Sequence, residues 1–96
     1  FYMPTAFSPN DDGINDVFEI YKSDEAAATI KSYKIFNIWG ELIHESVNFD
    51  FGDLGQFWDG SYQGSKLNSG IYIYAIEVLF ENGTIQTLSG DVTIIE

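Results

Sequence analysis

The stretch GIYIYAIEVLFENGTIQTL, residues 70–88, decides the fold. Apolar side chains at residues 71, 73 and 75 alternate with those at residues 72, 74 and 76, and this period of two is typical of a β-strand with both faces partly covered. The Asn82-Gly83 pair that follows is a dipeptide that tight β-hairpins prefer. We therefore expect an antiparallel hairpin of two strands, Gly70–Phe80 and Thr84–Glu96, with the second strand broken near Ser89–Gly90.

The same alternation continues outward along the chain. It predicts further strands over Tyr2–Phe7, Val17–Tyr21, Ile30–Trp39 and Glu41–Ser46. A chain reversal is expected at residues 39–41, because Gly40 supplies the backbone freedom of a tight turn. The composition of residues 23–29 favours a helix, but the segment is too short to form a stable helix alone. Residues 47–70 hold five of the nine glycines and therefore predict a long loop.

Many short strands, glycine turns and 17% aromatic residues indicate an all-β fold. The expected architecture is an immunoglobulin-like antiparallel β-sandwich of about seven strands. A length of 96 residues fits one domain over residues 1–96. Because the chain begins inside an expected strand, we expect it to be a fragment of a larger secreted or surface protein.

The charge of the chain limits its partners. Fifteen acidic residues stand against four lysines and no arginine, and the net charge is -11. Such a surface could not neutralise a nucleic-acid backbone, so cations or basic surfaces are the expected partners. The absence of cysteine excludes disulfides and thiol chemistry. No apolar run is long enough for a transmembrane helix.

Catalysis is not expected. His44 is the single histidine and lies in an alternating strand, where packing is the commoner role and no partner for nucleophilic chemistry is close in sequence. The loop carboxylates of Asp50, Asp53 and Asp59 could in principle form a glycosidase pair. Capping of turns explains those aspartates better.

The segment SPNDDGINDVFEI, residues 8–20, is rich in oxygen ligands. Around Gly13, its oxygens follow the 1, 3, 5, 7, 9, 12 order of a calcium loop, whose ligands would be Ser8, Asn10, Asp12, the Ile14 carbonyl, Asp16 and Glu19. Asp11 and Asn15 are further candidates. Hard oxygen ligands suit Ca²⁺ rather than zinc. Two interpretations stay open: a structural calcium site, or a polar turn in which Asn10 and Asp12 bond their own backbone.

Five motifs, in order and spacing, resemble a known family. They are AFSPNDDGINDVFEI, YKIFNIWGELIHES, FWDGSYQG, NSGIYIYAIEV and SGDVTIIE. Together they resemble the gliding motility-associated C-terminal domain, the type B sorting domain of the type IX secretion system of Bacteroidota. The chain departs from the family pattern at three positions: Ser8 replaces threonine, Asp11 replaces glycine, and Ile38 stands where arginine is common. The last change removes a cation beside Trp39.

The resemblance implies a secretion signal that the type IX machinery recognises. Such a domain directs its N-terminal cargo, after transit through the periplasm, across the outer membrane to the cell surface or the medium. Its partners would be outer-membrane and periplasmic components of that machinery.

A shared export signal must be presented on exposed loops or an edge strand. The candidate contact residues fall in three groups: Asn37, Trp39 and Gly40; Trp58, Asp59 and Gly60; and Asp91, Val92, Thr93, Ile94 and Ile95. For both tryptophans, packing in the core or in a turn is the competing interpretation. The alternative function is an immunoglobulin-like adhesion or carbohydrate-binding module, with Phe57, Trp58, Asp59 and Tyr62 as its platform.

Overall fold

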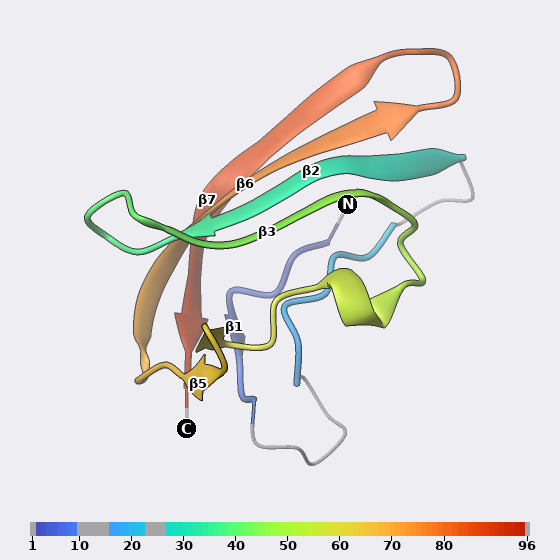
Figure 1. Cartoon of the computed structure of the whole chain (residues 1–96). Helices are drawn as coiled ribbons and strands as arrows, with labels where there is room; N and C mark the ends of the chain where they lie inside the picture. The colour runs from blue at the N-terminus through green and yellow to red at the C-terminus, as the bar shows by residue number, and fades with distance from the viewer. Residues whose placement is uncertain (1, 10–15, 23–26, 96) are drawn as a thin grey trace.

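The computed structural model describes residues 2–9, 16–22 and 27–95. Five strands form one sheet in the order β1-β7-β6-β2-β3. Their bounds are β1 Ala6–Phe7, β2 Ala28–Phe36, β3 Leu42–Phe49, β6 Gly70–Phe80 and β7 Ile85–Ile94. A small hairpin of β4, Ser61–Tyr62, and β5, Ser65–Lys66, and a 3-10 turn η1, Leu54–Gln56, lie between β3 and β6. Figure 1 shows the long strands across the top of the molecule, with irregular segments beneath one face.

The β6–β7 hairpin is confirmed and is the longest pairing of the sheet. Its antiparallel register runs from Gly70 opposite Ile94 to Leu79 opposite Ile85. At the turn, the Phe80 N–H donates to the Thr84 carbonyl at 2.8 Å. The expected break near Ser89–Gly90 is wrong, because both residues stay in register.

Gly90 has a packing role in β7. A Cβ atom built on Gly90 would lie 2.7 Å from the Tyr74 Oη and 3.0 Å from its Cζ. The Tyr74 side chain therefore lies across the strand at the one residue that leaves room for it. The glycine that suggested a break instead allows a close approach within an unbroken strand.

The β2–β3 hairpin and the β2–β6 pairing complete the antiparallel part of the sheet. β1 is the exception, because Ala6 and Phe7 pair in parallel with Thr93 and Ile94 of β7. All seven strands of the described residues lie in these two sheets, so the all-β prediction is confirmed. The fold is sandwich-like, since a second and mostly irregular layer covers one face of the five-stranded sheet (Figure 1).

That covering layer supplies large side chains to the core. Phe18 and Ile20 come from one irregular segment, and Phe57 and Trp58 come from the loop after η1; all four are buried. They pack against the inner face of the sheet, whose buried residues are Phe7, Ile30, Tyr33, Ile35, Phe49, Tyr74, Ile76, Val78, Val92 and Ile94. The expected strand Val17–Tyr21 is not a strand in the structure, apart from an isolated bridge between Tyr21 and Tyr2.

Tyr33 joins the sheet to the covering layer. Its hydroxyl donates to the Phe18 carbonyl at 2.8 Å and accepts from the Trp58 N–H at 3.1 Å. Phe18 and Trp58 are also joined directly, by a backbone hydrogen bond of 2.8 Å. Burial raises the pKa of Tyr33 far above its ordinary range, against the smaller opposite effect of its bond to Trp58. One buried hydroxyl therefore fixes two irregular segments against β2.

The prediction of a long loop over residues 47–70 was partly wrong, because this segment contains the end of β3, η1 and the β4–β5 hairpin. Within the expected helical stretch, residues 23–26 lie outside the described residues, and Ala28 and Thr29 belong to β2.

Candidate recognition surface

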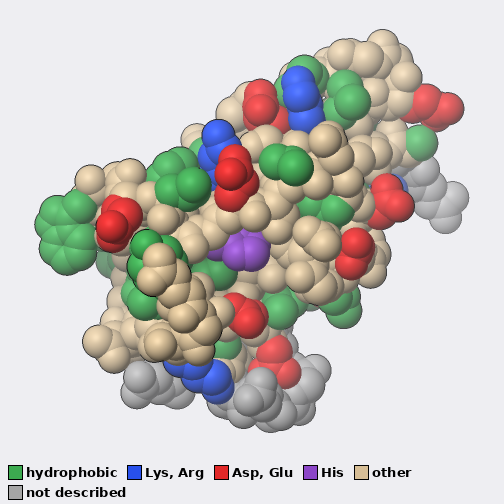
Figure 2. All heavy atoms as spheres, viewed as in Figure 1, with side chains coloured by type: hydrophobic (Ala, Val, Ile, Leu, Met, Phe, Trp, Pro, Cys, Tyr) green, Lys and Arg blue, Asp and Glu red, His purple; other side chains and the backbone are tan. Residues whose placement is uncertain are grey.

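The turn between β2 and β3 presents an exposed tryptophan. Trp39 is 84% exposed and its neighbour Ile38 is 62% exposed. Figure 1 shows this turn projecting beyond the rest of the sheet, and Figure 2 shows hydrophobic side chains at its tip. Gly40 has a φ of 85°, a left-handed conformation that closes the expected reversal.

Asn37 holds this turn in one conformation. Its backbone N–H donates to the Glu41 carbonyl at 3.0 Å, and its own carbonyl accepts from the Gly40 N–H at 3.0 Å. The Asn37 Oδ1 accepts from the backbone N–H groups of Trp39 at 3.0 Å and Glu41 at 2.9 Å. The Asn37 Nδ2 donates to the Glu41 Oε1 at 2.9 Å. The exposed Trp39 therefore stands on a rigid turn.

A groove lies between this turn and the start of β6. We call it the Trp39 groove and define it by Trp39, Glu41, Ile43, Tyr62, Ile71 and Tyr72. Its volume is about 370 Å³. Most of these residues are aromatic or aliphatic, and Glu41 is the acidic residue among those that line the groove. Such a concave apolar surface with a few polar groups has the composition of a binding site.

The corner Trp58-Asp59-Gly60 has a structural role. Trp58 is fully buried, and its Nε1 donates to the Ser61 carbonyl at 2.9 Å. The Asp59 Oδ1 accepts from the Ser61 backbone N–H at 3.1 Å and from the Ser61 hydroxyl. A Cβ atom on Gly60 would lie 2.9 Å from the Pro9 Cγ. This corner closes a packed turn, so the interpretation of Trp58 as a contact residue is corrected to a core role.

The terminal strand is also largely enclosed. Val92 and Ile94 are buried in the core. The backbone N–H groups of Thr93 and Ile95 donate to the carbonyls of Thr5 and Phe7. The sheet edge over residues 93–95 is therefore already paired and is not open for strand addition. Asp91 and Ile95 remain exposed at the surface.

The predicted calcium ligands fall mostly outside the described residues. Asn10, Asp11, Asp12, Ile14 and Asn15 lie there, and of the candidates after Gly13 only Asp16 and Glu19 are described, both half-buried. Burial and the adjacent Glu19, which accepts a hydrogen bond from the Tyr21 hydroxyl, raise the pKa of Tyr21. Within residues 2–9, 16–22 and 27–95, no group of three acidic or histidine side chains is arranged to hold a metal.

His44 lies beside Ser46, but the pair is not arranged for catalysis. The Ser46 hydroxyl donates to the Gln56 carbonyl at 2.7 Å, so its proton is directed away from the imidazole. The His44 Nε2 lies 3.2 Å from the same carbonyl and can bond it only as a donor. Burial lowers the pKa of His44, against smaller opposite effects of Gln56 and Asp59. This geometry fits a packing role, because the Tyr33 ring and the imidazole meet edge-on with 5.5 Å between their centroids.

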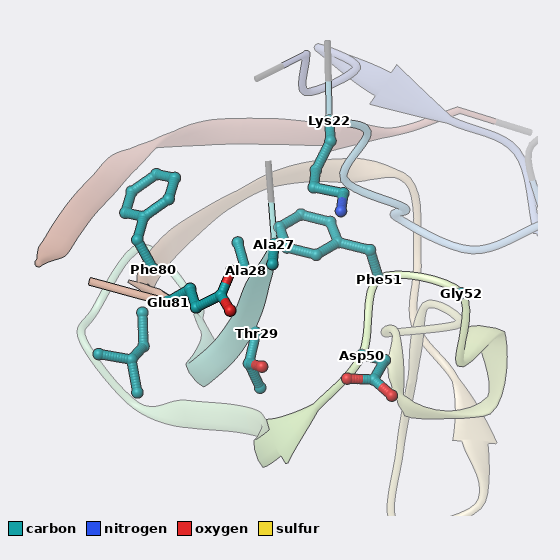
Figure 3. A pocket seen from close by; sticks show the side chains of 10 residues that line it. Lys22, Ala27, Ala28, Thr29, Asp50, Phe51, Gly52, Phe80 and Glu81 are labelled. Carbon is teal, nitrogen blue, oxygen red and sulfur yellow. The ribbon is translucent and has the colours of Figure 1, made fainter. Parts of the chain in front are cut away.

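A larger hollow of about 690 Å³ lies between the ends of β2 and β6 and the loop after β3. Figure 3 shows the Lys22 ammonium beside the Phe51 ring, with Asp50 turned away from them. The Lys22 Nζ is 5.4 Å from the ring centroid. The charged groups of the hollow do not converge on a common point (Figure 3).

The sequence as a whole matches a known protein family. Residues 1–94 match the family model of the CHU_C type IX secretion signal domain. The chain belongs to this family. Among curated proteins, none matches it with significant similarity.

Membership assigns the function in outline. A type IX secretion signal domain directs export to the cell surface or extracellular space and interacts with the secretion machinery. The alternative of an adhesion or carbohydrate-binding module is not favoured, and its proposed platform is not available, since Phe57 and Trp58 are buried. Within the described residues, no helix is long and apolar enough to cross a membrane.

Four residues of this signal domain's groove were missed in the sequence: Glu41, Ile43, Ile71 and Tyr72. Glu41 lies just before β3 and Ile43 within it, whereas Ile71 and Tyr72 come from β6, which is distant in sequence. A signal was available for Ile71, because the alternation of β6 places apolar side chains on both faces and one face has no covering layer. For Glu41, the signal was its position after the Asn37 turn.

Proposed function

We propose that the secretion machinery recognises this domain in its folded state and contacts it at the turn between β2 and β3 that carries Trp39, which we call the Trp39 turn. The observation that carries the proposal is an 84% exposed tryptophan on a turn fixed by hydrogen bonds to Asn37. Exposing a large aromatic side chain to water is unfavourable in isolation, and tryptophan is enriched among the residues that dominate binding energies. A turn that is already rigid loses little conformational entropy on binding.

We further propose that the contact forms in the periplasm, with a periplasmic or outer-membrane component, before the cargo crosses the outer membrane. A rigid surface feature supports this order of events, because recognition by shape requires that folding precedes contact. The absence of a catalytic arrangement at His44 and Ser46 supports a role in recognition without catalysis.

A structural calcium ion in residues 8–19 remains our proposal for the acidic segment. Its support is the spacing of oxygen ligands around Gly13 and the net charge of -11, since a bound cation would reduce self-repulsion in the folded state. Asn10, Asp12, Asp16 and the Ile14 carbonyl would hold the ion, with Asp11, Asn15 and Glu19 as further ligands. The ion would stabilise the fold and take no part in chemistry.

Export of a reporter tests the proposed contact. An inert, normally periplasmic protein is fused to the N-terminus of the domain in a host with a type IX system, and the surface-exposed fraction is measured. We expect Trp39→Ala to abolish surface display while the reporter accumulates inside the cell. Leu54→Ala is the matched control, because Leu54 is 51% exposed on η1 and lies outside the Trp39 groove.

Both variants should melt at the temperature of the parent domain, since each removes an exposed side chain. Normal display of a folded Trp39→Ala variant would contradict the proposal. Equal loss in both variants would show that the turn has no special role.

A further inference from the structure

The Trp39 groove has walls suited to a long, planar cation. Trp39 and Tyr62 are two of its aromatic residues, and Ile71, which is 54% exposed, is one of its aliphatic residues. Aromatic faces attract cations, and guanidinium groups stack on them better than ammonium groups do. The aliphatic part of the wall can cover the methylene stem of the same side chain.

Glu41 is the acidic residue that lines the groove. Its Oε1 accepts from the Nδ2 of Asn37, another lining residue, at 2.9 Å, which holds the carboxylate against the turn. In the described part of the chain, no lysine forms an ion pair with Glu41, whereas Lys34 pairs with Glu45 on the same sheet. The carboxylate can therefore accept hydrogen bonds from a partner's cation.

The charge of the domain identifies the kind of partner. Residues 1–96 contain no arginine and carry a net charge of -11, so a guanidinium in this groove must come from outside these residues. A second copy is disfavoured, because it contributes the same negative charge and no guanidinium. A basic surface is attracted over a distance by the whole domain and locally by Glu41.

We propose that the Trp39 groove receives an arginine side chain from a basic surface of the secretion machinery. The guanidinium stacks on the aromatic wall and bonds the Glu41 carboxylate, while its stem lies along the aliphatic wall. This inference rests on the proposed function, and it adds the chemical class of the group that is recognised.

Neutralising Glu41 is the first test, in the reporter export assay. Glu41→Gln keeps an oxygen that accepts from the Asn37 Nδ2, so the turn is retained and only the charge is lost. Glu45→Gln is the matched control, with the same change in net charge at an exposed position that pairs with Lys34. We expect a loss of export of roughly ten-fold for Glu41→Gln, the factor that a hydrogen bond between charged groups commonly contributes, and no loss for Glu45→Gln.

The outcomes separate the two proposals. Loss of export in Trp39→Ala with normal export in Glu41→Gln would overturn the arginine proposal and leave the Trp39 contact standing. Normal export in both folded variants would overturn both. Equal loss in Glu41→Gln and Glu45→Gln would assign the effect to overall charge and overturn the arginine site.

Direct binding is the second test, with the purified domain and a capped pentapeptide of one central arginine between glycines. The Trp39 indole resonance is followed by NMR, and a peptide with citrulline in place of arginine has the same shape without the charge. We expect the arginine peptide to shift this resonance, and an affinity roughly ten-fold weaker for citrulline or for the Glu41→Gln domain. Equal affinities, no shift with arginine, or a shift with a neutral oligosaccharide instead would overturn the inference.

Discussion

Replacing Tyr33 with phenylalanine should remove much of the stability of this domain. The change deletes one oxygen atom and leaves the ring contacts of Tyr33 with Phe18, Phe49 and Phe57 in place. It takes a donor from the Phe18 carbonyl and an acceptor from the Trp58 N–H, both in fully buried residues. A buried polar group left without its partner costs about 1–3 kcal/mol.

With two such groups, the expected loss for Tyr33→Phe is about 2–6 kcal/mol from a total of about 5–14 kcal/mol for a chain of this length. Because about 1 kcal/mol shifts the melting temperature of such a domain by about 4–8 °C, the melting temperature should fall by about 8 °C or more. Urea unfolding gives the free energy, and calorimetry gives the melting temperature.

Tyr72→Phe is the matched control for the same chemical change. Its hydroxyl donates to the Asn68 carbonyl at 3.2 Å in an exposed position, where water can replace it. We expect a loss of about 0.5 kcal/mol or less for this variant. A loss below about 1 kcal/mol for Tyr33→Phe would refute the reasoning that this hydroxyl joins the covering layer to the sheet.

Three further predictions concern packing, protonation and calcium. Gly90→Ala should cost about 1–3 kcal/mol in urea unfolding, because the new methyl group meets the Tyr74 ring; a gain in stability would contradict the close packing. The pKa of His44 in the folded state is lowered from 6.5, so the unfolded chain binds the proton first as the pH falls. Between about pH 7.5 and about pH 5.5, the free energy of unfolding of the parent domain should therefore fall more than that of His44→Gln. The same pH dependence in both proteins would contradict this prediction. Calcium at about a hundred times its dissociation constant should add about 2.7 kcal/mol relative to excess chelator in calorimetry, a gain that Asp12→Ala and Asp16→Ala should lose; the same gain in both variants would show that the ligands are wrong.

The two tryptophans show what the sequence could and could not predict. Trp39 precedes Gly40, and Trp58 precedes Asp59-Gly60, so both tryptophans stand before residues that favour turns. Trp58 is nevertheless fully buried, whereas Trp39 is 84% exposed. The position of Trp39 in the loop of a tight hairpin was predictable, and a side chain there points away from the core. The burial of Trp58 depends on how its loop folds back under the sheet, which local periodicity does not encode.

Pairing partners were also beyond local patterns. Buried Phe18 and Ile20 alternate with the half-buried Val17 and Glu19. Their backbone, however, bonds to the Trp58 loop at Phe18 instead of forming a strand ladder. Alternation reports which side chains are buried, whereas strand formation also needs a neighbouring chain in register. The Asn82-Gly83 hairpin was predictable because its partner is adjacent in sequence.

Surface display of a reporter fused to the Trp58→Ala domain tests most directly whether the export signal is a folded surface. This change removes a fully buried side chain and its hydrogen bond to Ser61, at a cost of about 3–5 kcal/mol, which is a large share of the total stability. It leaves Trp39, Glu41 and the sequence of the terminal strand intact. We predict that display is lost in proportion to the unfolded fraction and that the reporter remains inside the cell. Display at the parent level by a variant shown to be unfolded would contradict a folded signal and would indicate that the machinery reads the linear sequence.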